Sequence, residues 1–182
     1  MQMIADKAGI NKALLHYHYK TKQQLYENVL RRQFGKLIDS LFELLESETD
    51  FDTWLKSLIR KYLREILTQP GFSRFVLWEL SSDAKYLPAL FKQALAEKKQ
   101  DSSFIAQTIQ KRLAAEGLPE YDPLQFMLNL LSLCIYPGLA KPILEQIAGK
   151  EVFKEQDFTA KREDEIFKLI KYGIYGDKDV AK

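Results

Sequence analysis

Cysteine is almost missing from this sequence, since Cys134 is the single cysteine among 182 residues. One thiol cannot form an intrachain disulfide, so a disulfide scaffold is excluded and a reducing cytoplasm is the expected compartment. Glycine and proline are also sparse, at eight and six residues. So few turn-forming residues argue against a β fold with many tight turns.

A large charge imbalance is absent as well. The formal net charge is +2 and 46% of the residues are hydrophobic, which excludes intrinsic disorder. The N-terminal residues lack the apolar core of a signal peptide. The longest uncharged run, 123–140, includes Gln125, Asn129 and Pro137, so we expect a buried or interface helix there and no membrane span.

The charges that are present are unevenly distributed. Residues 1–36 hold seven Lys and Arg against two Asp and Glu, whereas residues 37–182 hold 20 against 23. A basic N-terminal segment on a mildly acidic body is typical of a chain that meets a polyanion with that end. A solvated basic face would have the same composition, so the local sequence pattern has to decide.

Apolar residues recur at steps of three and four along most of the chain, and no segment alternates with the period of two that strands show. The sequence therefore predicts an all-α fold. Thr21 and Gln24 form a capping box at the start of a long helix. Pro137 and Gly138 are expected to end the helix that Asp122 caps. The expected helices cover residues 21–45, 52–66, 72–80, 84–99, 103–116, 123–136 and 159–175, with a shorter helix ending at 148.

The most informative stretch is residues 3–25. Ala5 is small enough for two helices to cross closely, and Gly9, four residues later, can adopt the left-handed turn conformation. Asn11 follows as the N-cap of a second helix over about 12–19. This spacing predicts a helix-turn-helix whose second helix enters the major groove of DNA.

The same stretch resembles the DNA-binding signature of the TetR family of transcriptional repressors. The resemblance rests on the whole set of positions, with Tyr19 and Thr21 as close equivalents. The rest of the chain resembles the family only as a string of helices that ends in two able to form a dimer interface. The matching residues are Ile4, Ala5, Ala8, Gly9, Ile10, Leu15, His18, Lys22 and Leu25.

Three positions depart from the family pattern within this stretch. Asn11 stands where Ser or Thr is common, and it remains a good N-cap. Ala13 replaces a common Gly. His16 replaces a frequent Tyr that contacts the DNA backbone, which changes the reach and the protonation of that contact.

The family also has a first helix ahead of the position of Ile4, whereas three residues precede Ile4 here. Without that helix we expect Ile4, Leu15 and Tyr19 to lack part of their cover, and the chain to bind DNA poorly by itself. The resemblance implies two domains. Residues 1–36 are the remainder of a helix-turn-helix DNA-binding domain, and residues 37–182 are a ligand-binding and dimerisation domain.

The candidate DNA-binding residues lie on the second helix of the motif and just after it. Its lysines suit phosphate contacts, which add affinity without sequence information, although solvated lysines are the alternative. Tyr17 points away from the apolar side and can contact bases or sugar. His16 and His18 do not share a helix face, so we expect no metal site. The full set is Asn11, Lys12, Ala13, Leu14, His16, Tyr17, His18, Lys20 and Lys22.

In the resembling family the middle helices enclose a pocket for a small effector. Aromatic residues are frequent in the corresponding part of this chain, and plain core packing is the alternative for each of them. Arg74 and Glu79 lie among these aromatic residues, and we expect both at the surface. The candidate ligand-binding residues are Trp54, Tyr62, Phe75, Trp78, Tyr86, Phe91 and Phe126.

The segment 126–136 and the last helix are too apolar for helices exposed on their own. Two such helices from each of two subunits would form a four-helix bundle, so we expect a homodimer. Cys134 is expected there as a small buried hydrophobe. The candidate interface residues are Leu130, Leu133, Cys134, Ile166, Ile170 and Ile174.

Catalysis has little support in the sequence. Both histidines lie in the predicted recognition helix, and no phosphate-binding loop, dinucleotide fingerprint or zinc-protease motif occurs, so we expect neither an enzyme nor a cofactor. The resemblance implies a dimeric transcriptional regulator, most simply a repressor, that an unknown small-molecule effector releases from a palindromic operator. The alternative is a helical dimer that binds a small molecule or a protein and carries a degenerate DNA-binding head.

Overall fold

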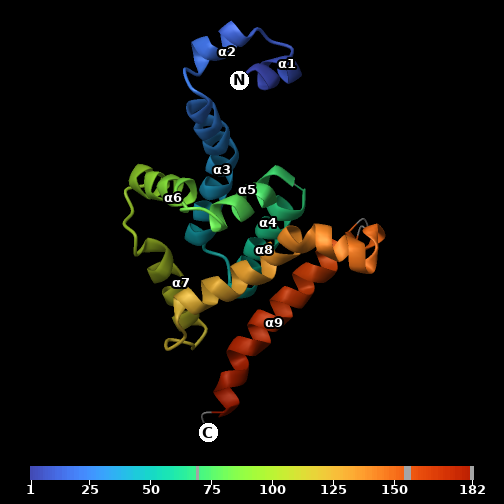
Figure 1. The fold of residues 1–182 in the computed structure, drawn as a ribbon. Coiled ribbons are helices and arrows are strands. Elements are labelled where there is room, and N and C mark those ends of the chain that lie inside the picture. Colours follow the sequence, from blue (N-terminus) through green and yellow to red (C-terminus); the bar gives the residue numbers. More distant parts are fainter. Residues whose placement is uncertain (69, 154–156, 181–182) are drawn as a thin grey trace.

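The computed structural model confirms the predicted all-α fold (Figure 1). It describes residues 1–68, 70–153 and 157–180, and for 33, 70, 72, 151 and 174–180 only the backbone. These described residues contain no strand. The elements are α1 (Gln2–Ala8), α2 (Lys12–His18), α3 (Lys22–Glu46), α4 (Phe51–Thr68), α5 (Pro70–Leu80), α6 (Tyr86–Glu97), α7 (Phe104–Ala115), α8 (Pro123–Ala148), a 3-10 turn η1 (Lys150–Phe153) and α9 (Phe158–Val180).

The molecule has a small head and a larger helical body, joined by one long helix (Figure 1). α1 and α2 form the head, and α3 leads from the head into the body. α3 runs unbroken through position 36. The division into residues 1–36 and 37–182 therefore falls inside a helix, and it stays a proposal.

Thr21 begins α3 as the sequence predicts. Its hydroxyl accepts a hydrogen bond from the backbone N–H of Gln24 at 3.1 Å, which satisfies a donor that the helix itself leaves unpaired. The buried stripe of α3 starts at Leu30, whereas Tyr26 and Val29 are still exposed. The first turns of α3 therefore stand outside the core and support the head.

α4 lies at the centre of the body. Trp54, Leu55, Ile59 and Leu63 on this helix have no exposed surface. α4 contacts α3, α5, α8 and α9, and burying each such side chain stabilises the fold by roughly 1.5–3 kcal/mol. This central helix therefore positions the other helices relative to one another.

The helix break expected at Pro137 and Gly138 does not occur. α8 continues through both residues and through Pro142 to Ala148. A proline inside a helix removes one hydrogen bond and destabilises it by about 3 kcal/mol. Here Pro137 and Gly138 are buried, and Gly138 lies directly against Ile66 of α4. The prediction was wrong because the close packing between α8 and α4 stabilises a continuous helix.

Arg112 attaches α7 to the loop between α3 and α4. Its guanidinium donates hydrogen bonds to the carbonyl oxygens of Thr49, at 3.0 Å, and Ser47. It also lies 4.7 Å from the centre of the Trp54 ring, a cation–π contact. These contacts hold α7 beside the end of α3, where both helices border the cavity described below.

Candidate DNA-binding head and ligand pocket

The head is a helix-turn-helix built on two small residues. Ala5 is completely buried where α1 contacts α2. Gly9 ends α1 in the left-handed conformation, with φ 65° and ψ 26°, a conformation that a residue with a side chain rarely adopts. The side-chain oxygen of Asn11 accepts a hydrogen bond from the backbone N–H of Ala13 at 2.8 Å. The predicted turn and N-cap are both confirmed.

α2 presents most of its side chains to solvent. Leu15 is its buried residue, and Tyr17 is 81% exposed. Within the described residues, no group of three His, Cys, Asp or Glu side chains could hold a metal ion. All the predicted DNA-binding residues are exposed, on α2 or directly beside it: Asn11, Lys12, Ala13, Leu14, His16, Tyr17, His18, Lys20 and Lys22.

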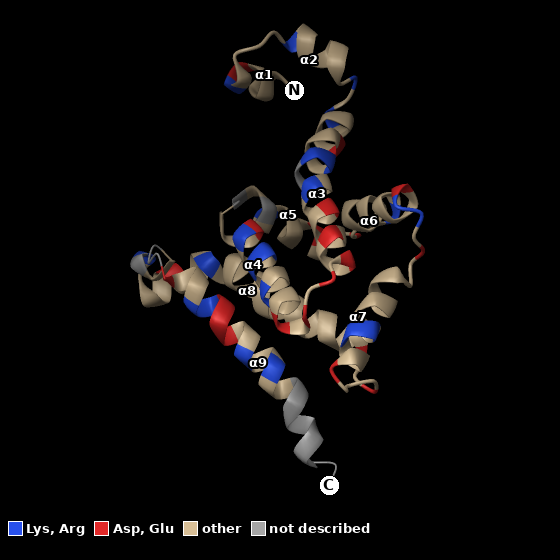
Figure 2. Cartoon of the chain, turned by 180° about the vertical axis from the view of Figure 1, so that it is seen from behind, with Lys and Arg blue, Asp and Glu red and all other residues tan. Residues whose placement is uncertain are grey.

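Positive charge surrounds this exposed helix. Figure 2 shows Lys and Arg at the start of α2, in the linker after it and along the first half of α3, whereas Asp and Glu gather in the second half of α3. The basic N-terminal segment of the sequence is therefore one end of the molecule. This placement suits phosphate contacts on both sides of α2.

The apolar residues of the head are covered unevenly. Ile4 is 39% exposed and Tyr19 is half-buried, in line with the expectation that they lack part of their cover. Leu15 is only 5% exposed, so the expectation was wrong there, because packing within the head already covers it. The large exposed hydrophobic residues of the head are Met3, Ile4, Ile10, Leu14 and Tyr17.

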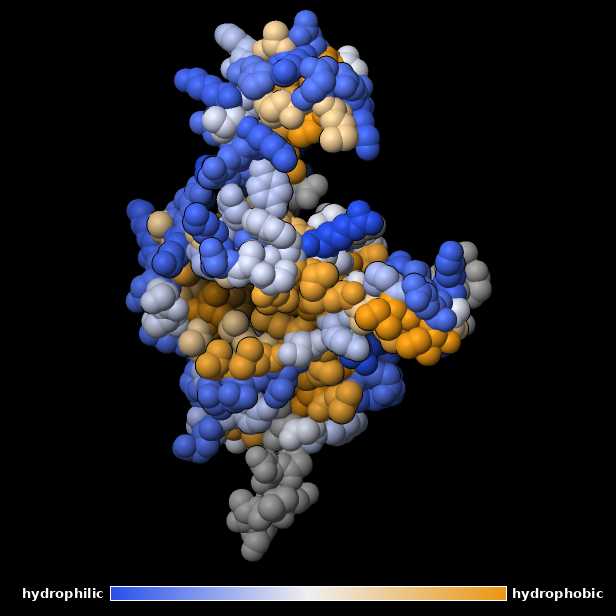
Figure 3. Space-filling view, in the orientation of Figure 1, coloured by the Kyte–Doolittle hydropathy of each residue, from blue (hydrophilic) through white to orange (hydrophobic). Residues whose placement is uncertain are grey.

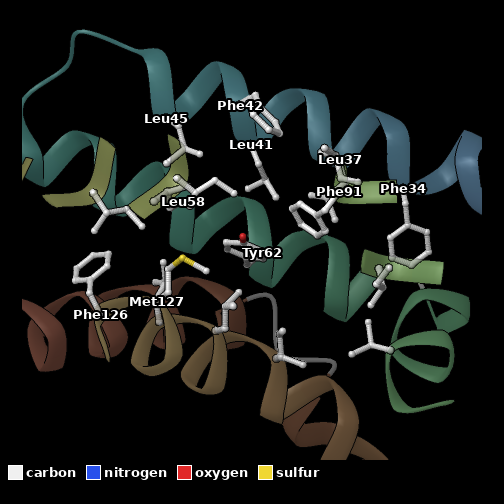
Figure 4. A pocket seen from close by; sticks show the side chains of 18 of the residues that line it. Phe34, Leu37, Leu41, Phe42, Leu45, Leu58, Tyr62, Phe91, Phe126 and Met127 are labelled. Carbon is white, nitrogen blue, oxygen red and sulfur yellow. The ribbon is translucent and has the colours of Figure 1, made fainter. Parts of the chain in front are cut away.

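A cavity of about 430 Å³ lies inside the body (Figure 4). α4, α5, α6, α7 and α8 form most of its wall. Its volume falls within the range of roughly 300–1,000 Å³ that is usual for small-molecule sites. The remaining wall belongs to α3 and consists of Phe34, Leu37, Ile38, Leu41, Phe42 and Leu45.

Three of the seven predicted ligand-binding residues line this cavity, namely Tyr62, Phe91 and Phe126. Trp54 does not line it. The Trp54 ring is buried and stacks on the Phe126 ring with centroids 5.9 Å apart. The sequence missed the wall from α3, because an aliphatic stripe has the pattern of ordinary core. Its only signal was the width of that stripe.

The other three predicted ligand-binding residues lie outside the cavity wall. Phe75, Trp78 and Tyr86 surround Tyr26 of α3, with ring centroids 6.3, 5.9 and 5.5 Å from its ring. Their edge-to-face geometry is favourable for aromatic pairs. We call these four residues the aromatic junction. The junction connects the head side of α3 to α5 and α6.

Glu79 supports the aromatic junction from inside. It is 2% exposed, so the expected surface position was wrong. Its carboxylate accepts hydrogen bonds from the backbone N–H groups of Tyr86, at 3.0 Å, and Leu87, at 2.8 Å. These donors are the first residues of α6, which has no side-chain N-cap of its own. Glu79 is buried because it caps α6 from α5.

Comparison with known proteins agrees with the geometry of the head. Residues 1–29 match the family described as "Bacterial regulatory proteins, tetR family". The head is therefore similar to the DNA-binding region of the TetR family. Over 62 residues it is 32% identical to the HTH-type transcriptional activator FasR of Mycolicibacterium smegmatis (strain ATCC 700084 / mc(2)155). That stretch covers 34% of this chain and 28% of the length of the relative.

The predicted interface residues lie on the last two helices of the body, α8 and α9. The predicted interface residue Leu133 is half-buried, and the side chain of Ile174 lies outside the described residues. The others are buried within the single chain, and their assignment to a subunit interface stays a prediction. α8 is apolar on most sides, so its sequence does not distinguish the face that packs inside the chain from the face that remains exposed. The residues buried within one chain are Leu130, Cys134, Ile166 and Ile170.

Other apolar residues of α8 and α9 point outward. Ile143 and Ile147 lie near the end of α8 and are 63% and 79% exposed. Figure 3 shows an apolar patch over this end of α8, at the right of the view. α8 also has the length and apolarity of a membrane-crossing helix, a property that core helices share. Exposed apolar residues of this size suit an interaction surface when they are contiguous. The exposed apolar residues are Leu124, Leu128, Tyr136, Ile143, Ile147, Leu169 and Tyr172.

Proposed function

We propose that this chain is a homodimeric transcriptional regulator that binds operator DNA with its head and a small molecule with its body. One observation carries the proposal. The first turns of α3 support the exposed helix α2, and the second half of α3 forms a wall of the 430 Å³ cavity. A molecule in the cavity therefore touches the same helix that carries the head.

DNA recognition falls to α2. Its exposed side chains enter the major groove, where Tyr17 meets base edges or sugar, while Lys12, Lys20 and Lys22 meet phosphates. In a dimer with two-fold symmetry, two such helices read the half-sites of a palindrome about 34 Å apart. The operator is therefore palindromic.

Dimerisation falls to the outward faces of α8 and α9. Leu128 of α8 and Leu169 of α9 are 49% and 56% exposed. Two copies of these helices cover each other's apolar faces in a four-helix bundle with an isologous interface. Apolar burial of this kind accounts for the exposed stripe on α8 without a membrane.

Regulation runs through α6 to α3. α6 contributes Leu87 and Phe91 to the cavity wall, and its first residue, Tyr86, packs on Tyr26 of α3. A ligand that displaces α6 therefore changes the contact between Tyr86 and Tyr26, which orients the head. Gly35 lies on α3 between Tyr26 and most of the cavity wall, and it acts as the hinge. To release the operator, the ligand must bind a few kcal/mol more tightly to the conformation in which the spacing of the two heads does not fit the operator half-sites.

The sign of regulation that we propose is repression relieved by the ligand. The relative FasR is named a transcriptional activator, which makes activation the second candidate. A reporter gene behind the operator decides between them. Expression that rises when the regulator gene is deleted supports a repressor, and expression that falls supports an activator.

Fluorescence anisotropy of labelled DNA tests the proposal itself. The complete reading frame is titrated against its own promoter region and against a shuffled duplex at physiological salt. We expect a preference of ~10³ or more for the promoter. Equal and weak binding to both duplexes contradicts a sequence-specific regulator. It would favour the helical ligand-binding dimer with a degenerate head.

A further inference from the structure

The cavity in the body has a uniform chemical character. Except for Tyr62, every residue that lines it has a hydrocarbon or thioether side chain. Among the residues that the structure describes, no Lys, Arg, His, Asp or Glu belongs to the wall. Within the described residues, the wall therefore offers an ionic group of a ligand no counter-charge.

Tyr62 is the exception. Figure 4 shows its hydroxyl oxygen in the middle of the cavity, between the α3 wall and α8. A tyrosine hydroxyl is neutral at physiological pH, and the apolar surroundings desolvate this one and raise its pKa further above the usual range. Among the described residues it has no hydrogen-bond partner. A polar group in this position favours a ligand atom that can accept its proton in a hydrogen bond.

We propose, resting on the proposed function of this cavity as the effector site, that the effector is an uncharged and mainly apolar molecule. Its one essential polar atom is a hydrogen-bond acceptor that meets the Tyr62 hydroxyl. The rest of the molecule is hydrocarbon and packs on the side chains of α3, α6 and α8.

Desolvation is the reason that charged molecules are excluded. An ion inside an apolar wall loses its hydration, and that loss is compensated only by a counter-ion or by several hydrogen bonds. Lys98 is a cation that lies close to the cavity. Its Nζ is 5.3 Å from the ring centre of the wall residue Phe42 and 3.9 Å from a carboxylate oxygen of Asp39. Lys98 is already paired and is not part of the cavity wall.

Three probes with the same hydrocarbon part test the proposal. Decanol, decanoate and decylamine are neutral, anionic and cationic at neutral pH, and each competes with the neutral dye Nile red for the full-length protein. The readout is the loss of Nile red fluorescence. The same titrations are repeated with Tyr62→Phe, which keeps the ring, and with Tyr19→Phe, which removes a hydroxyl from the head.

We expect decanol to displace the dye at a concentration at least tenfold lower than either charged probe. Tyr62→Phe should weaken decanol about three- to tenfold, the effect of one hydrogen bond, while Tyr19→Phe should leave it unchanged. The proposal is overturned if decanoate or decylamine competes as well as decanol. It is also overturned if Tyr62→Phe and Tyr19→Phe behave alike. If Tyr62→Phe does not fold, the comparison of the three probes on the unmodified protein still decides.

Operator binding is followed in parallel by anisotropy, without any probe in the cavity. An absence of sequence-specific DNA binding would contradict the proposed function as a regulator, but it would not affect the conclusion on ligand class from the displacement of Nile red. Failure of decanol to outcompete the charged probes contradicts the ligand class and leaves operator binding as it is. The two failures are therefore distinguishable.

Discussion

The carboxylate of Glu79 accepts a hydrogen bond from the backbone N–H of Leu87 at 2.8 Å. Glu79 belongs to α5, while Leu87 lies in the first turn of α6 and also lines the cavity. A buried side chain therefore positions the helix that closes the cavity. The same carboxylate also accepts a hydrogen bond from the backbone N–H of Tyr86. The ring of Tyr86 belongs to the aromatic junction and contacts Tyr26 of α3. The cap, the cavity and the head side of α3 meet at one point.

Glu79→Gln should lower the free energy of unfolding by about 1–2 kcal/mol, because the amide has one acceptor oxygen and no charge to match two helix N–H donors. Urea unfolding measures this change. Glu97→Gln is the matched control, since Glu97 is exposed at the end of α6, the helix that Glu79 caps, and it should change stability by less than about 0.5 kcal/mol. Equal effects of the two substitutions would show that the buried cap has no special role.

Gly138→Ala should destabilise the fold by about 1–3 kcal/mol. A Cβ atom at this position would overlap the side chain of Ile66 on α4, and a packed core does not absorb an added methyl group without strain. Gly35→Ala, within α3, meets nothing within 4 Å. Alanine there should stabilise the helix by about 0.5–1 kcal/mol. Thermal unfolding that moves both variants in the same direction would contradict this difference in packing.

Lys22→Gln should weaken binding to the operator and to the shuffled duplex alike. A lost phosphate contact removes affinity without changing sequence preference, and it reduces the slope of log K against log salt by about 1. Tyr17→Ala should instead reduce the preference for the operator. Lys111→Gln, an exposed lysine on α7, is the control for the loss of a charge. A salt slope that is the same in Lys22→Gln and in Lys111→Gln would exclude Lys22 from the DNA interface.

Leu169→Glu should convert the dimer into a monomer, because it places a charge in the proposed contact between two copies of α9. Sedimentation velocity reports the mass directly. Leu80→Glu changes an equally apolar and 70% exposed residue on α5, and it should leave the dimer intact. A Leu169→Glu protein that still sediments as a dimer would move the interface away from the outward face of α9.

Cys134 should make stability fall at alkaline pH. Burial raises the pKa of its thiol to about 12, above the value of about 8.5 in an unfolded chain. The stabilisation is complete below the unfolded value, and it decreases by up to about 1.4 kcal/mol per pH unit as the pH rises towards the folded value. Cys134→Ala should show a shallower decline from about pH 9. Identical slopes of the two proteins in urea unfolding would contradict a protonated, buried thiol.

Local features of this protein follow directly from its sequence. Gly9, Asn11, Thr21 and Asp122 end or begin helices where their backbone and side-chain chemistry predicts, because a turn or an N-cap involves residues close together in the chain. The same local spacing carries the resemblance of the head to the TetR family. The exposed face of α2 follows from its apolar period.

Only the tertiary structure decided which apolar residues form the core, which line the cavity and which stay exposed. Periodicity identifies the apolar face of a helix, but the element that covers this face depends on how several helices pack. For this reason Cys134 belongs to the core of one chain, Trp54 stacks beside the cavity without lining it, and the aliphatic stripe of α3 becomes its wall. The burial of Glu79 has the same cause, since its hydrogen-bond partners lie on the next helix.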